Sequence, residues 1–387
     1  MLERMTAALP QMLADLEELV RCESPSRDLA AVAGSADVVA RIGTVSLGAE
    51  PERIVLDGRT HLRWRLGTGP ARVLVLGHHD TVWPLGSFEP VWSLADGVVR
   101  GPGCFDMKAG LVLAFTALAA LPDREGVTVL VTGDEELGSP SSRELIEKEA
   151  LGCAAALVLE ASAAGGALKT ARKGVSLYEV AVTGRAAHAG LEPERGVNAG
   201  VELAHQVLAI AQLGDPARGT TVTPTLSAAG TASNTVPARA TVAVDVRVPD
   251  EAEQDRVDAA MRALRPVLPG AQVTVTGGPN RPPLAPDASA ALFDRAAALA
   301  RDLGLPPLEG TAVGGGSDGN LTAGVGVPTL DGLGAVGGGA HADDEHVLVD
   351  RLPGRAALVA ALVADLLAEA GPSAGTNCAP DFGRGRP

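Results

Sequence analysis

The sequence predicts an α/β protein in which a second, smaller domain is inserted into the first. From about Arg72, short apolar runs end at polar or glycine-rich turns and alternate with helix-like segments, which is the pattern of an α/β domain. From Gly174 to Thr276, strand and helix patterns follow the order β-α-β-β-α-β, which is typical of a split βαβ unit on an antiparallel sheet. The first pattern resumes near Ala288, so we expect the βαββαβ unit to be an insertion.

The first part of the chain is predicted to place reactive side chains where buried strands end. The periodicity of Leu9–Val20 predicts a helix, and Leu111–Leu121 reads as a continuous apolar helix. Three predicted strands each lead into polar residues: Val73–Leu76 into GHHD, Val127–Val131 into TGDEE, and Ala154–Leu159 into Glu160. Because open α/β sheets bind ligands beyond the carboxyl ends of their strands, we expect these groups to converge.

The inserted part has its own sequence of elements. They are a strand in VSLYEVAV after Gly174, a helix near 197–213, strands near 221–227 and 240–248, a helix near 251–264 and a strand near 272–276. The Pro-rich stretch 279–283 is interpreted as a linker. The predicted domains are therefore a catalytic domain of residues 1–173 and 282–370, an inserted domain of residues 174–281, and a Gly/Pro-rich, disordered tail of residues 371–387.

Composition limits the partners and the location. The 387-residue chain carries a net charge of −15, which argues against nucleic acid or an anionic membrane surface as a partner. Its start has no basic region followed by an apolar region, so no signal peptide is predicted, and no segment is expected to span a membrane. Four cysteines without CxxC spacing predict reduced thiols and a cytoplasmic location: Cys22, Cys104, Cys153 and Cys378.

Five segments carry groups suited to a divalent cation. They hold His78, His79 and Asp80 in GHHD, Asp106 in GPGCFDMKAG, Glu135 and Glu136 in TGDEELGS, Glu160 in LVLEAS, and His341 in GGGAHADDEH. An acidic pair is usually a solvated surface feature, but a pair that directly follows an apolar strand is better explained by a site. Imidazole with carboxylate is a zinc-like ligand set. Such a set holds two cations about 3.5–4 Å apart when one carboxylate bridges them, and Asp106 is the predicted bridge.

The HHD sequence also indicates which histidine is the ligand. A carboxylate that accepts a hydrogen bond from one imidazole nitrogen fixes the tautomer and leaves the other nitrogen for a metal. Asp80 is suited to that role, and the H-x-D spacing favours His78 over His79.

The ordered motifs GHHDTVWP, GPGCFDMKAG, GDEELGS, isolated Glu160, GRAAHAG, GGGSDGN and GGGAHADDEH resemble those of the M20 family of zinc metallopeptidases. Within the family they are most similar to the glutamate carboxypeptidase (carboxypeptidase G2-like) branch. The resemblance runs from the N-terminal helix to about Leu367. It implies a zinc-exopeptidase-like catalytic domain with an inserted, ferredoxin-like lid domain that mediates homodimerisation.

The resemblance also assigns roles to residues. It implies one Zn²⁺ on His78, Asp106 and Glu160, and another on His341, Asp106 and Glu136, with Co²⁺ or Mn²⁺ as possible replacements. Glu135 would be the general base, and Asp80 belongs to the catalytic set. One departure is Met107, where the closest branch usually has a second Asp after the bridging Asp. Since that side chain is not a ligand in the family, the ligand prediction is unchanged.

Three lid residues are implied to act on the substrate. His188 in GRAAHAG matches the histidine that reaches the partner subunit's active site and stabilises the oxyanion. Arg247 in DVRV and Asn234 in SNTVP resemble residues that hold the substrate's terminal carboxylate, a role suited to a planar guanidinium. The loop 314–318, GGGSD, resembles the family's turn that binds oxygen and carboxylate groups through its backbone.

The expected reaction is hydrolysis of a peptide or N-acyl amino acid beside a free carboxylate, with release of glutamate or a similar amino acid. An N-acyl-amino-acid deacylase or a dipeptidase would use the same metal site, because specificity lies in pocket contacts that motifs do not reveal. Glu160, where family aminopeptidases tend to have Asp, favours a carboxypeptidase or acylase. A non-catalytic binding subunit would lack a ligand or the base, and none is missing. Nucleotide binding is disfavoured because no loop matches a dinucleotide or P-loop motif.

Overall fold

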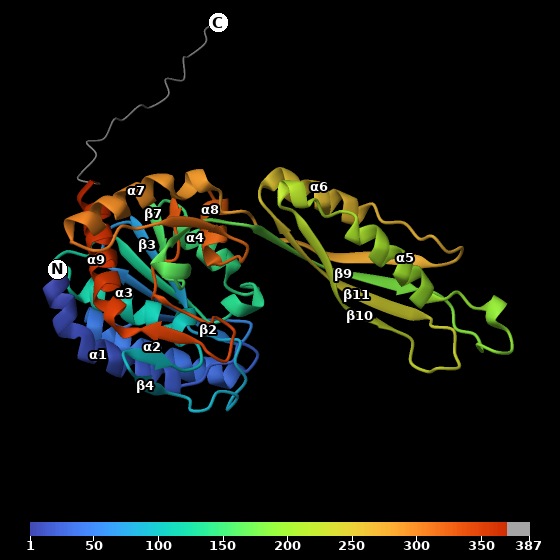
Figure 1. Ribbon diagram of the computed structural model, residues 1–387, viewed down its shortest axis with the longest axis horizontal. Helices are drawn as coiled ribbons and strands as arrows, with labels where there is room; N and C mark the ends of the chain where they lie inside the picture. Colours follow the sequence, from blue (N-terminus) through green and yellow to red (C-terminus); the bar gives the residue numbers. More distant parts are fainter. Residues whose placement is uncertain (370–387) are drawn as a thin grey trace, which may run out of the picture.

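The structure is a computed structural model that describes residues 1–369. The predicted tail of residues 371–387 lies outside the described residues. A six-stranded sheet forms the centre of the larger body (Figure 1), in the order β1 (Glu52–Leu56), β2 (Arg59–Leu66), β6 (Val127–Thr132), β3 (Val73–His78), β7 (Ala155–Val158) and β14 (Thr329–Leu330). Strands β6, β3, β7 and β14 run parallel, and the β1–β2 hairpin adds an antiparallel edge.

Both faces of this sheet are buried, which explains the uninterrupted apolar runs of its parallel strands. Val73 and Val75 of β3 belong to the core on one face, and Leu74 and Leu76 to the core on the other. The first face is covered by α1 (Leu2–Arg21), α2 (Leu29–Leu47), α3 (Ala109–Ala119), α7 (Pro286–Asp302) and α9 (Leu352–Glu369). The second is covered by α4 (Arg143–Ala150) and α8 (Asp318–Gly324).

Short strands tie distant loops to this body. One small sheet has the order β15 (Gly337–Gly338), β16 (His346–Leu348), β5 (Val98–Arg100) and β4 (Ser93–Ala95), and a parallel pair joins β13 (Gly310–Val313) to β8 (Leu168–Arg172). The first sheet holds the chain near residue 100 beside the chain near residue 346. The short helices are η1 (Cys104–Lys108), η2 (Glu135–Leu137), η3 (Ala164–Gly166), η4 (Pro193–Arg195), η5 (Pro216–Arg218) and η6 (Val349–Arg351).

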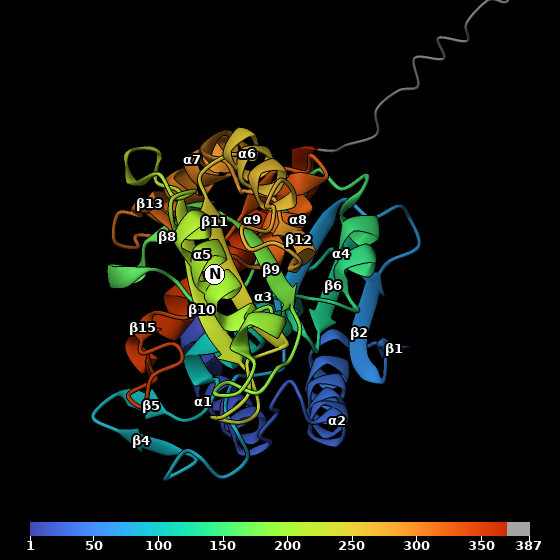
Figure 2. The same ribbon diagram turned by 90° about the vertical axis from the view of Figure 1, so that its right-hand side faces the viewer.

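The inserted unit is a four-stranded antiparallel sheet with two helices on one face (Figures 1 and 2). Its strands lie in the order β10 (Thr221–Ala229), β11 (Arg239–Val248), β9 (Gly174–Thr183) and β12 (Gln272–Arg281), and its helices are α5 (Ala199–Ala211) and α6 (Glu251–Arg262). Alternate residues of the two central strands, such as Val180, Val182, Val242 and Val244, form a separate core beneath the helices. We call this unit the lid.

The predicted α/β fold with an inserted βαββαβ unit is confirmed by this topology and by the structural relatives described below. The interpretation of residues 279–283 as a linker was wrong in part. Strand β12 continues to Arg281, which pairs with Val175 of β9. Strand β12 is an edge strand of the lid sheet, and an edge strand tolerates the missing N–H of Pro279. The chain crosses between the two bodies at Lys173 and again at Pro282.

Within residues 1–369, one helix meets the criterion for a membrane-spanning segment when only length and composition are considered. Helix α2 has 19 residues with a mean hydropathy of 1.3, which meets that criterion. In the structure, however, α2 packs against β2 and α3 and buries Val32, Val39 and Ile42. Its apolar residues are therefore those of a helix in the core of the larger body.

Candidate metal centre

Three of the predicted ligand segments lie at the carboxyl edge of the central sheet. His78 is the last residue of β3, Glu136 lies in η2 just after β6, and Glu160 follows β7 by two residues. Parallel strands end at the same edge, so the three side chains converge, as predicted. The approach is close at Gly77, where an added Cβ would lie 2.7 Å from Cε of Met107. The buried Met107 therefore packs on β3 directly before His78.

The other two segments reach the same place from outside the central sheet. Asp106 lies in η1, at the start of α3, and His341 lies in the loop between β15 and β16. Pairing of His346 with Arg100 draws the two loops together. His341 has a positive φ of 61°, a conformation that few non-glycine residues adopt and that is found most often at functional sites.

Asp106 lies between the imidazole rings of His78 and His341, and each of its carboxylate oxygens faces one ring. Its Oδ1 is 3.5 Å from Nε2 of His78, and its Oδ2 is 3.4 Å from Nε2 of His341. The remaining carboxylates divide in the same way: Oε1 of Glu160 is 3.5 Å from Nε2 of His78, and Oε2 of Glu136 is 3.2 Å from Nε2 of His341. Asp106 is thus the carboxylate that contacts both histidines. The groups whose ligand atoms all lie within 4.8 Å of one another are His78 with Asp106 and Glu136, and His78 with Glu135 and Glu160.

The donor types and the four histidine–carboxylate separations fit metal coordination. Two ligand atoms about 2.0–2.1 Å from one tetrahedral zinc ion lie about 3.3 Å apart, and the four separations given above fall close to that value. Within residues 1–369, Nε2 of His78 and Oε1 of Glu136 are buried without a hydrogen-bond partner. Buried polar atoms rarely lack partners, so both are accounted for if they face a metal ion.

The electrostatics of the cluster agree with this fit. Contacts with Asp106 and then Glu136 raise the pKa of His341 to about 10. Burial opposes the charged form of His78, but Asp106, Asp80 and Glu160 together raise its pKa well above its ordinary value. Burial raises the pKa of Glu136 to about 7. The buried carboxylates repel one another, so without a cation the cluster keeps protons on some of its side chains. A divalent cation would displace these protons.

Asp80 contacts His78 through its backbone carbonyl, whereas the sequence suggested a hydrogen bond to its carboxylate, whose Oδ1 lies 3.4 Å from Nδ1 of His78. Nδ1 of His78 donates to the carbonyl oxygen of Asp80 (3.0 Å), which leaves Nε2 free to face Asp106. The Asp80 carboxylate accepts from Ser26 Oγ at 2.6 Å and from the backbone N–H groups of Glu135 and Glu136 at 3.2 and 3.3 Å. His79 points elsewhere, since its Nε2 donates to the carbonyl oxygen of Thr60 (3.0 Å).

Glu135 contacts an arginine that is not among the predicted site residues. Its Oε1 accepts from Nη2 of Arg281 at 2.8 Å, and Nη1 of the same guanidinium donates to Asp318 at 2.7 Å. Burial raises the pKa of Glu135 well above its ordinary value, although Arg281 opposes the rise. Arg281 lies in the segment read as a linker. The signal that could have revealed it is a lone cation within an apolar, Pro-rich stretch.

A second arginine outside the predicted set of site residues lies beside Glu160. Arg172 is buried, forms an ion pair with Asp331 at 2.7 Å, and places Nη2 3.8 Å from Oε2 of Glu160. It also donates to the carbonyl oxygens of Gly315 and Gly316. The glycine loop is therefore held through its backbone by Arg172, while Asp318 turns inward to Arg281. Two buried guanidinium groups thus flank the carboxylate cluster.

The three predicted lid residues lie at opposite ends of the lid sheet. His188 and Asn234 are exposed and adjacent, since the backbone of Ala189 donates to the carbonyl oxygen of Asn234. Arg247 pairs with Val175 near the crossing into the larger body, and its guanidinium bonds Asp245. Arg247 is eight residues along β11 from Arg239 at the other end of the strand, which corresponds to about 27 Å at about 3.4 Å per residue. The structure does not bring the three together within one chain.

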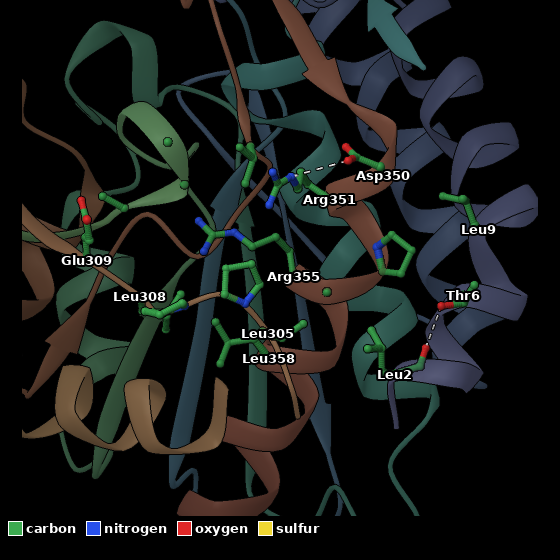
Figure 3. A pocket seen from close by; sticks show the side chains of 18 residues that line it. Leu2, Thr6, Leu9, Leu305, Leu308, Glu309, Asp350, Arg351, Arg355 and Leu358 are labelled. Carbon is green, nitrogen blue, oxygen red and sulfur yellow. Dashed lines mark hydrogen bonds and ion pairs between the residues drawn. The ribbon is translucent and has the colours of Figure 1, made fainter. Parts of the chain in front are cut away.

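A separate cavity of about 610 Å³ lies on the larger body, between the start of α1, the start of α9 and residues 305–309 (Figure 3). Its lining includes none of the five predicted metal ligands. Arg355 lines it, but two of its nitrogens donate to the carbonyl oxygens of Gly332 and Gly334 at 2.7 and 2.9 Å. We therefore place the candidate centre at the sheet edge and not in this cavity.

Comparisons of the sequence and of the structure with known proteins agree on one family. The pattern of Peptidase family M20/M25/M40 matches residues 74–365. Carboxypeptidase G2 from Pseudomonas sp. (strain RS-16) is 32% identical over 375 residues, which cover 92% of this chain and 89% of that protein. Succinyl-diaminopimelate desuccinylase from Methylorubrum extorquens (strain PA1) is 29% identical over 378 residues, covering 88% and 95%.

Solved structures show the same fold at lower identity. The M20 family metallo-carboxypeptidase Sso-CP2 from Sulfolobus solfataricus superposes with a TM-score of 0.72 at 16% identity, covering 91% of this chain and 98% of that one. The dipeptidase Dug1p from Saccharomyces cerevisiae gives a TM-score of 0.71 at 15% identity, covering 94% and 97%. These relatives share one architecture and differ in the substrates that their names record.

Proposed function

The chain belongs to peptidase family M20/M25/M40 and is a hydrolytic enzyme, and from this premise we propose that it uses two zinc ions to cleave an amide bond beside a free carboxylate. The observation that carries the proposal is Asp106, whose two oxygens face the Nε2 atoms of His78 and His341 at 3.5 and 3.4 Å. One zinc would be held by His78, Asp106 and Glu160, and the other by His341, Asp106 and Glu136. Co²⁺ and Mn²⁺ accept the same donor types.

The chain's own residues supply the proton transfers. When bound, the two ions would acidify a water molecule between them and polarise the carbonyl oxygen of the amide. Glu135 takes a proton from the attacking water and later delivers it to the leaving amine. Burial favours its neutral form, while Arg281 at 2.8 Å favours the carboxylate, so the pair keeps Glu135 able to exchange a proton. Asp80 holds the His78 ring and the backbone N–H groups of Glu135 and Glu136 in place beside the proposed metal site.

We propose a substrate with a free carboxylate next to the scissile amide, in the class of N-acyl amino acids and short peptides. The named relatives include a carboxypeptidase and a succinyl-diaminopimelate desuccinylase, and this class of substrate agrees with both names. Arg247 and Asn234 of the lid are the proposed carboxylate partners. The guanidinium of Arg247 now contacts Asp245, so it must release Asp245 to bind the substrate. The substrate's carboxylate can replace that of Asp245 with the same charge-assisted, bidentate hydrogen bonds. Release of glutamate is the specific expectation, and deacylation of other amino acids is the alternative.

We also propose that the enzyme is a homodimer joined through the lid. His188 and Asn234 lie beyond the end of the lid sheet opposite to Arg247, so a site that uses all three is best explained by residues from two chains. Exposed apolar side chains on α5 and the edge strand β10, namely Val201, Leu208 and Leu226, support an interface there. The free thiols Cys22, Cys104 and Cys153 support a reducing, cytoplasmic location.

Mixing two inactive variants tests the dimer. Glu135→Gln lacks the base and His188→Ala lacks the lid imidazole, so each homodimer has only defective sites. In a mixed dimer, one site combines the wild-type Glu135 of one chain with the wild-type His188 of the other. If His188 serves the partner's site, mixing restores about a quarter of the wild-type activity per site. No gain on mixing would mean that His188 acts within its own chain or not at all.

Hydrolysis of a small substrate panel tests the reaction. The panel contains N-acyl-glutamate, benzoyl-glutamate, other N-acyl amino acids and dipeptides, each with zinc-loaded and chelated protein. Chelator-sensitive release of glutamate would establish the carboxypeptidase activity. Chelator-sensitive cleavage of the other substrates alone would assign the chain to the deacylase or dipeptidase branch. Absence of cleavage in both metal states would contradict the proposal.

A further inference from the structure

Glu345 is a fully buried acid four residues after His341 that has no part in the reaction described above. Its Oε1 accepts hydrogen bonds from the backbone N–H groups of Phe105 and Asp106, at 2.9 and 3.0 Å. Its Oε2 accepts from the backbone N–H of Gly103 at 2.9 Å and from Nε1 of Trp83 at 2.7 Å. Four donors therefore converge on one buried carboxylate.

This arrangement requires a carboxylate and not merely a polar side chain. Each oxygen of Glu345 receives two N–H groups, and an ionised carboxylate is the side chain that offers acceptors on both atoms. A glutamine in the same place would turn an NH₂ group towards two of the donors and leave them unpaired in the interior. Unpaired buried donors are costly, and hydrogen bonds to a charged group are stronger than neutral ones. The network is thus built around the negative charge of Glu345.

The two segments that Glu345 joins are those of the second proposed cation. Its own turn carries His341 and is fixed by a hydrogen bond from the Glu345 backbone N–H to the carbonyl oxygen of Ala342 (2.9 Å). The turn that it binds carries Asp106, whose Oδ2 faces Nε2 of His341 at 3.4 Å. His78 is attached differently, at the end of β3. The Glu345 carboxylate is therefore a short, rigid connection between Asp106 and His341.

We propose that Glu345 is a positioning residue that sets the separation of Asp106 and His341, and so controls the affinity of the cation that these two residues share with Glu136. The inference rests on the proposed two-metal function. Groups that hold metal ligands in place typically contribute about 10- to 100-fold to metal affinity. The other cation shares Asp106 but takes its remaining ligands from His78 and Glu160, which Glu345 does not contact, so that cation is affected less.

The test is stepwise competition for Zn²⁺ between a chromophoric chelator and the metal-free full-length protein. Wild type, Glu345→Gln and the control Asp343→Asn are compared. Asp343 is an exposed acid in the same turn, so the control removes one charge at nearly the same place. We expect Glu345→Gln to weaken one of the two binding steps about 10- to 100-fold and the other by less than about tenfold. Asp343→Asn should match wild type in both steps.

The outcomes separate this inference from the function on which it rests. Wild-type protein that binds no Zn²⁺ would overturn the proposed function and the inference with it. Two normal binding steps in both wild type and Glu345→Gln would overturn the inference alone. Equal weakening of both steps with a lower melting temperature would show a general structural role, and would also overturn it.

A milder variant covers the case in which Glu345→Gln does not fold. Trp83→Phe removes one of the four donors and keeps a ring to pack against Phe88, which lies edge-on at 5.1 Å. We expect a loss of about two- to fivefold in the same binding step, since one hydrogen bond is removed. In metal-free Trp83→Phe, the amides of Gly103, Phe105 and Asp106 should exchange hydrogen faster than in wild type. Unchanged affinity and exchange would contradict the role of Glu345.

Discussion

Replacement of Glu135 by glutamine separates proton transfer from metal binding. The side chain accepts a hydrogen bond from Arg281 at 2.8 Å, and glutamine keeps an oxygen for that bond and nearly the same volume. The change therefore removes the ability to take up a proton while the surrounding contacts remain. General acid–base catalysis contributes about 10²- to 10⁴-fold, which corresponds to about 2.7–5.4 kcal/mol of activation free energy. We expect kcat to fall by that factor, with two ions still bound.

Glu136→Gln is the matched comparison, since it changes the neighbouring residue by the same atoms. Oε2 of Glu136 lies 3.2 Å from Nε2 of His341, and we expect this variant to lose metal as well as turnover. The assay is kcat at saturating substrate together with the metal content of the same samples by elemental analysis. Glu135 also lies near His78 and Glu160, close enough to be a ligand itself. Loss of metal from Glu135→Gln, or retention of more than about a tenth of kcat, would refute its assignment as the base.

Four further predictions follow from the site and the lid. Asp106→Asn should lower the affinity for both ions by more than about tenfold, measured by chelator competition, since one residue serves both; loss of one ion only would show that it does not bridge. Contacts with Asp106 raise the pKa of His341 to about 10, so zinc binding must displace a proton and the affinity for zinc should fall as pH falls. Calorimetry in buffers of different ionisation enthalpy should detect this proton release. A binding enthalpy that does not depend on the buffer would contradict the prediction. Arg247→Ala should raise KM about 10- to 100-fold with a smaller change in kcat, and an unchanged KM would remove Arg247 from the carboxylate site. In the lid, hydrogen bonds from Arg256 and other donors lower the pKa of Glu253 to about 2. The ionised side chain therefore stabilises the fold above its ordinary pKa of 4.5, and this contribution is lost as pH falls towards 2. Glu253→Gln should lower the melting temperature at pH 7 and have little effect near pH 2.

The elements that could be predicted from sequence are those whose pattern is local. Strands β3, β6 and β7 are buried on both faces, so each is a continuous apolar run that ends at a polar residue. The lid strands have one buried face and alternate accordingly. Helix α2 was missed because it is apolar around most of its circumference and shows little periodicity. Strand β2 was missed because it contains charged residues, two of which pair with Glu149.

The candidate site was predicted to the extent that its residues follow recognisable strand ends and motifs. The structure brings His78, Asp106, Glu136, Glu160 and His341 together, and their roles as ligands remain proposals. Arg172, Arg281 and Glu345 were missed, because each has a partner more than 100 residues away along the chain: Asp331, Glu135 and Phe105, respectively. Such contacts depend on tertiary packing, which no local pattern encodes. The positions of the lid residues also could not be read from motifs, since they depend on the length of the lid sheet.

The central claim is that hydrolysis depends on two cations arranged around Asp106. Stepwise addition of Zn²⁺ to the metal-free protein, with turnover of an N-acyl amino acid and bound metal measured on the same samples, tests it most directly. The account predicts no turnover without metal, a rise as metal binds, and a plateau at two ions per chain. Full turnover of the metal-free protein, or a plateau at one ion, would contradict the claim.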